Sequence, residues 1–390
     1  MHFELSEDQA RLVSTLRRFV EGELMPLEEG IESSGELDAA KAREVFEKSR
    51  SLGFYAMNIP EEHGGGGLSA LDTMLAEEQF GHTSDILVRR AFGNVYESLL
   101  ACTGEQRQQW LLPAVRGERT CSIAMTEPGA GSDAGAIKTR AEKFGAGWIV
   151  KGGKHFVSDG LFSDFFIVSA VTDPAARPRH VSLFLIDKSM PGVTVGRDQE
   201  MMGLRGTSHV ELHFDGVKVG RENLLGEEGD GLALSHSTLG RVRLAQAGAR
   251  AIGKACRLMT LMTAYAKERR QFGKSIGEFQ MIQQMIADSA IEINGARLLL
   301  HRAAWEIDQR RDAADWISMV KVSAAETLGR VADRAVQVFG GMGYCRALPI
   351  ERLYRDARIY RIFDGTSEIH RTVLAKSAIG QGAEMWDIGA

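Results

Sequence analysis

The 390-residue sequence contains little cysteine and no excess of basic residues. Its four cysteines, Cys102, Cys121, Cys256 and Cys345, are scattered and form no CxxC pair. This argues against a disulfide framework or a zinc site and predicts free thiols in a reducing compartment. The formal net charge of -5 gives no reason to expect a nucleic acid or an anionic membrane as a partner.

Long apolar runs and a secretory leader are also missing. No apolar run reaches the length of about 18 residues that a membrane-spanning helix needs. The first residues, MHFELSEDQARLV, lack a basic segment followed by an apolar one. The sequence has no GxSxG motif, so a hydrolase reading has little support. His209 and His213 lie on an expected strand about 13 Å apart, too far to bind one metal ion. We therefore expect a cytoplasmic protein without a metal site or a membrane span.

Hydrophobic periodicity divides the chain into three zones. Residues 1–118 are largely helical, since Leu12, Leu16 and Phe19 recur at helical spacing after Ser6, a plausible N-cap. This zone is expected to be an N-terminal helical domain.

The other two zones differ in period from each other. Residues 119–228 are rich in β-branched and aromatic residues, and Val210, Leu212 and Phe214 alternate with polar positions, which predicts a mainly antiparallel β domain. Residues 229–390 return to a helical period and are expected to form a C-terminal helical bundle domain. Strands and helices do not alternate, so the pattern indicates an α+β protein and argues against a Rossmann fold.

Three stretches could hold a ligand. CSIAMTEPGAGSDAGAIKTRA carries Thr126 and Ser132 in a glycine-rich turn whose backbone a ligand could approach, although a plain surface turn explains it as well. In HFVSDG, Phe156 and Ser158 share a strand face that could support a planar heteroaromatic ring, and ordinary strand packing is the alternative. In ERRQFGKSIGEFQ, Arg269 and its neighbour could bind phosphate or form a solvated charge pair.

A fourth stretch, YRIFDGTSEIHR, places Asp364 directly before a glycine and a threonine, which raises the possibility of a catalytic base. Together these stretches resemble the acyl-CoA dehydrogenase family over essentially the whole chain. AMTEPGAGSDAGA is similar to the family's first signature, and QVFGGMGYCRALPIERLYRD is similar to its second, except that Ala347 stands where an acidic residue or Asn is usual. ERRQFGKSIGEFQ and DGTSEIHR resemble two further family motifs in the expected order.

The resemblance implies a helical, β and four-helix-bundle architecture, with FAD held between the subunits of a homotetramer. Arg269, Phe272, Gln337 and Gly341 would then contact the FAD of a neighbouring subunit. The residues that the resemblance assigns to FAD are Met125, Thr126, Gly131, Ser132, Phe156, Ser158, Arg269, Phe272, Gln337, Gly341, Thr366 and Glu368.

The resemblance also implies the reaction and its base. A carboxylate removes the α-proton of an acyl-CoA, the β-hydride passes to the flavin, and an electron-transfer flavoprotein accepts the electrons from the enzyme. Most family members have Glu where this chain has Asp364, and the helix LGRVRLAQAGARAIG, where other members place the base, offers no carboxylate. Asp364 is therefore the best candidate. Ser132, Arg243 and Gly365 are candidate substrate contacts.

Two departures from the family pattern bear on the substrate. Asp is one methylene shorter than Glu, about 1.5 Å of reach, which predicts a branched, cyclic or otherwise atypical acyl group. Arg89 and Arg90 fall in a region that lines the acyl pocket of relatives. We expect a solvent-facing or CoA-phosphate role for these arginines, with contact to an acidic substrate as the alternative.

Two other functions remain open from the sequence. Nitroalkane oxidases share this fold and use an Asp base with dioxygen as the oxidant. A flavin-binding subunit without catalysis is the second alternative, although the retained carboxylate at position 364 argues against it.

Overall fold

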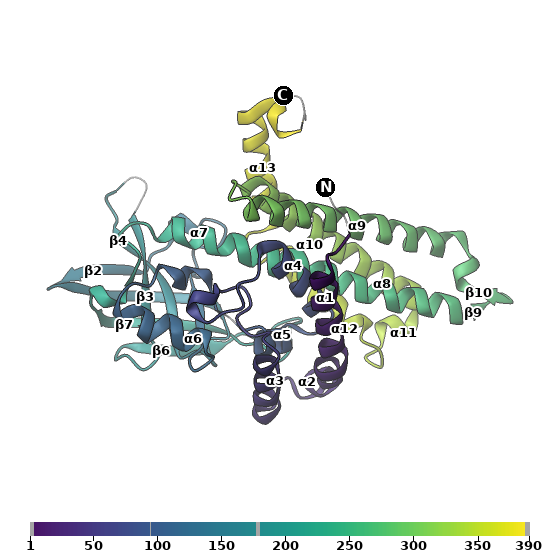
Figure 1. Cartoon of the computed structure of the whole chain (residues 1–390), viewed down its shortest axis with the longest axis horizontal. Coiled ribbons are helices and arrows are strands. Elements are labelled where there is room, and N and C mark those ends of the chain that lie inside the picture. The colour runs from purple at the N-terminus through teal and green to yellow at the C-terminus, as the bar shows by residue number, and fades with distance from the viewer. Residues whose placement is uncertain (1–3, 94, 177–179, 387–390) are drawn as a thin grey trace.

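The computed structural model describes residues 4–93, 95–176 and 180–386. A β domain occupies one end of the molecule and long helices occupy the other, with the first helices packed between them (Figure 1). The expected order of helical, β and helical parts is confirmed. Within the described residues, no helix is both long enough and apolar enough to cross a bilayer.

The N-terminal part is helical because short amphipathic segments with clear caps follow one another. Ser6 caps the first helix: its Oγ accepts from the N–H of Gln9 at 3.2 Å, and the Gln9 side chain accepts from the N–H of Ser6. Leu16 and Phe19 on this helix are buried, as their spacing predicts. The helices are α1 (Glu7–Phe19), α2 (Glu28–Ser34), α3 (Ala39–Ser51), α4 (Ala70–Phe80), α5 (Asp85–Ala91) and α6 (Leu112–Val115).

The β domain is one sheet of eight strands in the order β6-β7-β3-β2-β4-β5-β8, with β1 beside β4. Most neighbours are antiparallel, as expected, while β1 and β2 pair with β4 in parallel. The alternating residues Val210, Leu212 and Phe214 are buried in its core. The strands are β1 (Cys121–Ala124), β2 (Arg140–Phe144), β3 (Gly147–Ser158), β4 (Phe165–Asp173), β5 (His180–Asp187), β6 (Val193–Asp198), β7 (His209–Val219) and β8 (Leu224–Leu225).

The C-terminal part is a bundle of long helices around α10, with an alanine-rich core that lets the helices approach closely. A nearly continuous helix made of α7, a π-helical segment η8 and α8 runs from the β domain into this bundle (Figure 1). The elements are α7 (Gly231–Val242), η8 (Arg243–Arg250), α8 (Ala251–Glu268), the hairpin β9 (Arg270–Gln271) and β10 (Lys274–Ser275), α9 (Gln280–Asp308), α10 (Ala314–Phe339), α11 (Gly341–Tyr344), α12 (Ile350–Ile359) and α13 (Ser367–Gln381).

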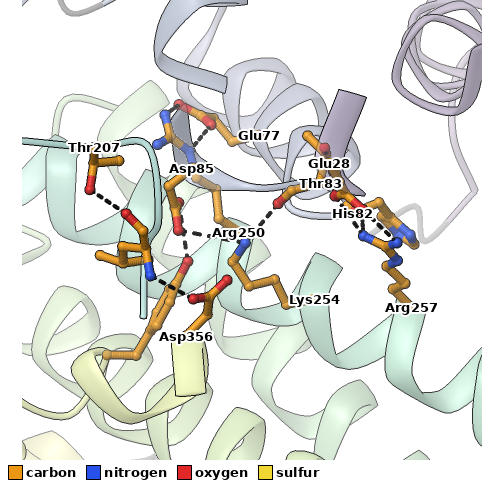
Figure 2. A network of polar contacts seen from close by, with 12 residues as sticks. Glu28, Glu77, His82, Thr83, Asp85, Thr207, Arg250, Lys254, Arg257 and Asp356 are labelled. Atoms are coloured by element: carbon orange, nitrogen blue, oxygen red, sulfur yellow. Dashed lines mark hydrogen bonds and ion pairs between the residues drawn. The ribbon is translucent and has the colours of Figure 1, made fainter. Parts of the chain in front are cut away.

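Buried polar contacts fix this long helix against the N-terminal helices (Figure 2). Arg250 forms a bidentate ion pair with Glu77 of α4, at 2.6 and 3.0 Å. One turn later, Lys254 donates to the main-chain oxygen of Thr83 at 2.7 Å. Because each group is removed from water, losing one partner would leave a buried group unsatisfied. The helix that carries η8 is therefore held in one position relative to α4.

Candidate active site

Asp364 lies in a tight turn between α12 and α13. Both Asp364 and Gly365 have left-handed backbone conformations, with φ of 55° and 88°. Asp tolerates this conformation better than most residues, and glycine adopts it freely. A Cβ atom at Gly365 would lie 2.9 Å from Nε2 of His370, so the turn requires glycine there. The sequence Asp-Gly thus sets the direction of the Asp364 side chain.

Two side chains hold the main-chain oxygen of Asp364. Arg243, the first residue of η8, donates to it from Nε at 2.7 Å, and His370 Nε2 lies 3.2 Å away. Burial lowers the pKa of His370 to about 4, so the ring is neutral. Since Nε2 must then carry the hydrogen, Nδ1 is the acceptor for the hydroxyl of Ser318 at 3.1 Å. This arrangement fixes the peptide that follows Asp364.

The carboxylate of Asp364 has the surroundings of a general base. Its Oδ2 atom is buried, and the described part of the chain offers it no hydrogen-bond partner. Loss of solvation raises the pKa of Asp364 above its ordinary value, although nearby cations, chiefly Arg243 and Lys321, oppose the rise. An unbonded carboxylate with a raised pKa can accept a proton from a ligand placed next to it.

Lys321 is a buried cation near this carboxylate that the sequence analysis missed. It lies on α10, is fully buried, and its Nζ has no hydrogen-bond partner among the described residues. Burial lowers the pKa of Lys321 to about 8, while the charge of Asp364 opposes that shift. The available signal was a lysine between two valines in a helical segment.

The glycine-rich turn after β1 lies against the end of β3. The N–H of His155 donates to the main-chain oxygen of Thr126 at 2.8 Å. Buried Lys154 donates to the oxygen of Met125 at 3.1 Å and to Glu127 at 2.8 Å. The turn is therefore fixed beside the strand that carries Phe156.

The surface next to this turn can accept a flat aromatic group. Phe156 has a left-handed φ of 54°, is 50% exposed, and stacks on the His155 ring at 4.0 Å between centroids. Ser158 is partly exposed at the next position on the same face. Gly131 has open space where a Cβ would lie, and the neighbouring Ser132 is exposed. Met125, Thr126, Gly131, Ser132, Phe156 and Ser158 thus form one region.

Four of the other predicted FAD residues lie at the far end of the molecule. The β9–β10 hairpin follows Arg269, and Figure 1 shows it at the opposite end from β3. Phe272 at the hairpin tip has a φ of 51° and is 93% exposed. Tyr265 stacks on Phe339 at 4.2 Å, which brings the ends of α8 and α10 together, and with them the exposed residues Arg269, Phe272, Gln337 and Gly341.

The turn at Asp364 holds the remaining predicted contacts. Thr366 Oγ1 accepts from the N–H of Ile369 at 3.2 Å and caps α13, and Glu368 is exposed in the first turn of that helix. One chain therefore does not bring all the predicted FAD residues to one place. The residues of the two surfaces fit FAD when the surfaces come from different subunits. One surface has an exposed aromatic ring, Phe156, with hydroxyl groups near it, and the other has an exposed arginine, Arg269.

The expectation that Arg89 faces solvent or a CoA phosphate is wrong. Arg89 is only 6% exposed and pairs with Asp159 at 3.1 Å, directly after Ser158. Arg90 is partly buried with its guanidinium 4.7 Å from the centroid of the Phe162 ring. The partners of Arg89 and Arg90 are about 70 residues away in the sequence, so the local pattern gave no sign of these contacts.

Three protein-family models together match most of the chain. Residues 6–118 match the acyl-CoA dehydrogenase N-terminal domain, 122–217 the middle domain and 229–379 the C-terminal domain. The chain is 35% identical over 378 residues to the human short-chain specific acyl-CoA dehydrogenase of mitochondria, covering 95% of this chain and 90% of that protein.

Two further proteins bear on the cofactor and on partners. A subunit of the caffeyl-CoA reductase-Etf complex of Acetobacterium woodii is 34% identical over 381 residues, covering 95% of this chain and 98% of that protein. The solved FAD complex of PigA superposes with a TM-score of 0.89 at 28% identity, covering 98% of this chain and all of that one.

Proposed function

The chain belongs to the acyl-CoA dehydrogenase family, whose members are FAD-dependent oxidoreductases acting on CH–CH donors, and we propose that Asp364 is its catalytic base. The observation that carries this assignment is the Oδ2 atom of Asp364, which is buried and has no hydrogen-bond partner among the described residues. It lies in a turn whose main chain is fixed by Arg243 and His370. The described part of η8, where other members place the base, contains no carboxylate.

Asp364 takes the α-proton of the acyl thioester onto its carboxylate. The cations Arg243 and Lys321 favour the ionised form of this buried group, since the charge of each lowers the pKa of Asp364 and so opposes the rise caused by burial. Bound FAD supplies the acceptor for the hydride that leaves the β-carbon. The α-proton of a thioester is weakly acidic, so the base must be placed accurately, which the double hydrogen bond to its main-chain oxygen achieves. The proposed substrate contacts remain Ser132 in the flavin region, Arg243 of η8 and Gly365 in the turn.

The shorter reach of Asp364 supports a substrate whose α-carbon lies close to the turn. Glu would extend about 1.5 Å further, and a misplacement of about 1 Å can cost roughly a hundredfold in rate. We therefore propose a branched, cyclic or otherwise atypical acyl group.

Electron transfer and assembly are proposed on separate grounds. The two predicted FAD surfaces, at opposite ends of the molecule, support a homotetramer in which each FAD lies between subunits. The relationship to a subunit of the caffeyl-CoA reductase-Etf complex supports an electron-transfer flavoprotein as the redox partner. None of the four cysteines forms a disulfide within the described structure, which supports a reducing compartment, for which we propose the cytoplasm.

An exchange of Asp364→Glu tests the substrate class. Rates are measured with acyl-CoAs of equal carbon number that are straight, branched at the β-carbon or cyclic. We expect the unchanged enzyme to prefer a branched or cyclic thioester and the Glu variant to lose most of that preference. Straight-chain thioesters that are the best substrates of the unchanged enzyme would refute the proposed class while leaving the assignment of the base intact.

A further inference from the structure

Lys154 is a charged residue in the interior of the β domain. It lies on β3 and is only 1% exposed, while Val150 and Val157 of the same strand are buried in the apolar core. Replacing a buried ion pair by apolar side chains is often neutral or even stabilising, so stability alone gives little reason for a lysine at this position. The contacts of its ammonium group give a better reason.

The ammonium group of Lys154 joins β3 to two other segments. Its Nζ donates to the main-chain oxygen of Met125 at 3.1 Å, to Oε1 of Glu127 at 2.8 Å and to Oγ of Ser169 on β4 at 3.0 Å. An ammonium group has three hydrogens, so these acceptors use all of them. Two of the three acceptors belong to the glycine-rich turn that follows β1. Lys154 is therefore bound mainly to that turn.

Glu127 fastens the turn at a second place. Its carboxylate accepts from the N–H groups of Lys138 and Thr139 at 2.7 and 3.0 Å, in addition to the ammonium of Lys154. Although burial opposes the shift, these donors and the charge of Lys154 hold the pKa of Glu127 below its ordinary value. The carboxylate thus stays ionised and keeps the turn attached both to β3 and to the segment before β2.

Consecutive residues of β3 orient the two peptide groups that follow Met125. The Lys154 side chain binds the oxygen of Met125. The N–H of His155 donates to the oxygen of Thr126 at 2.8 Å. The C=O and N–H groups of a trans peptide point in opposite directions, so the N–H of Thr126 points away from Lys154. No main-chain acceptor is found for this N–H among the described residues, and Thr126 is partly exposed. The turn thus offers a main-chain donor at a residue that a ligand can reach.

We propose that Lys154 is a positioning residue for the flavin, because by holding the main-chain oxygen of Met125 it directs the N–H of Thr126 to the bound ring. The inference rests on the proposed function, since it assumes that FAD lies beside Thr126 and Phe156. A donor that is fixed in advance stabilises the negative charge that reduction places on the ring, without a cost of reorganisation. Lys154 should therefore affect both the retention of FAD and its reduction potential.

The test uses the FAD-loaded enzyme and two measurements other than activity. FAD release after dilution is followed by the fluorescence of free flavin, and the midpoint potential of the retained flavin is measured by reductive titration against a reference dye. Lys154→Met keeps most of the side-chain volume and removes the ammonium group. We expect FAD release to be at least about tenfold faster, which corresponds to the loss of one charge-assisted hydrogen bond, and the midpoint potential to be lower.

Two controls separate positioning from stability. Ser169→Ala removes the acceptor of Lys154 that lies outside the turn, and should change the rate of FAD release by less than about twofold. Lys254→Met removes an equally buried ammonium group from α8, where it donates to the main-chain oxygen of Thr83 at 2.7 Å. This variant should lower the thermal midpoint of unfolding and leave FAD release and the potential unchanged. Unchanged release and potential in Lys154→Met, or an equal change in Lys254→Met, would overturn the inference.

Glu127→Gln provides the test if Lys154→Met does not fold. The glutamine keeps an oxygen for the N–H groups of Lys138 and Thr139, but it lacks the charge that binds Lys154. FAD release should then be at least about threefold faster, and an unchanged rate would overturn the inference.

Ser132→Trp distinguishes failure of this inference from failure of the proposed flavin region. If the Ser132→Trp variant retains FAD, the proposed region is wrong and the inference is wrong with it. If that variant loses FAD while Lys154→Met changes neither measurement, the region stands and the positioning role of Lys154 alone is refuted.

Discussion

Arg243 donates from Nε to the main-chain oxygen of Asp364 at 2.7 Å, across 121 residues of sequence. This bond joins η8 to the turn between α12 and α13. The same guanidinium lowers the pKa of the Asp364 carboxyl, so one side chain both positions the base and favours its ionised form. The consequences can be measured at each of the groups involved.

Removing the carboxylate should abolish proton abstraction without loss of the cofactor. Asp364→Asn keeps the shape of the side chain and its turn, since Asn also tolerates a left-handed φ. We expect kcat to fall by about 10³-fold or more, consistent with the loss of a general base, while FAD remains bound. Stopped-flow reduction of the flavin measures the step, and Asp312→Asn at an exposed position is the control. Retention of more than a tenth of the rate would exclude Asp364 as the base.

The charge of Lys321 should affect the pH dependence of kcat/KM. The base works when ionised, so kcat/KM rises as the pH passes upward through the raised pKa of Asp364. Lys321→Met removes a cation that lowers this pKa, and the acidic limb of the profile should therefore move to higher pH.

If Lys321 only stabilised the fold, its replacement would lower the thermal stability and leave the pH profile unchanged. Its Nζ is buried and has no hydrogen-bond partner among the described residues, so the methionine variant should be at least as resistant to heat as the unchanged protein. The exposed Lys376→Met is the control and should move neither quantity. A profile of Lys321→Met that coincides with that of the unchanged enzyme would refute the electrostatic role.

The buried charges between the N-terminal and C-terminal helices should dominate stability. Arg257 of α8 forms two hydrogen bonds of 2.8 Å with Glu28 of α2, and both side chains are nearly inaccessible. Among the described residues, Arg257→Met leaves the buried Glu28 with Arg352 as its one ionic partner, and should cost about 3 kcal/mol. The exposed pair of Arg11 with Asp8 provides the control, where Arg11→Met should cost less than about 0.5 kcal/mol. Equal midpoints in a denaturant titration of the two variants would contradict this.

A shared cofactor site predicts complementation between two defective chains. Arg269→Glu damages one FAD surface, and Ser132→Trp fills the other, so neither variant alone should retain FAD. Mixed oligomers from co-expression contain sites built from two undamaged surfaces and should recover FAD at up to half of the positions. FAD absorbance per chain in purified mixed oligomers measures this. No recovery in oligomers shown to contain both chains would contradict the shared site.

The sequence predicted the fold well because each part of the chain has its own hydrophobic period. Alternation at Val210 and Leu212 and helical spacing at Leu16 reflect which face of each element is buried. The turn at Asp364 could be predicted because it is local, with its left-handed backbone encoded by two adjacent residues, Asp364 and Gly365.

The rest of the site depends on contacts between distant segments. Arg89 was expected at the surface, and its burial against Asp159 follows from the packing of α5 on the end of β3. Lys321 and Arg250 lie on helices whose hydrophobic periodicity gave no sign of a special role for them. Their interaction with Asp364 follows from the tertiary structure. Local pattern carries no information about such pairings.

The most direct test of the account is an anaerobic titration of the purified protein with acyl-CoAs, followed at the visible absorption band of the flavin. We predict that at least one class of thioester bleaches the band in the unchanged protein and that none does so in Asp364→Asn. A band that persists with every thioester, while nitroalkanes bleach it or drive oxygen uptake, would contradict dehydrogenation and identify an oxidase.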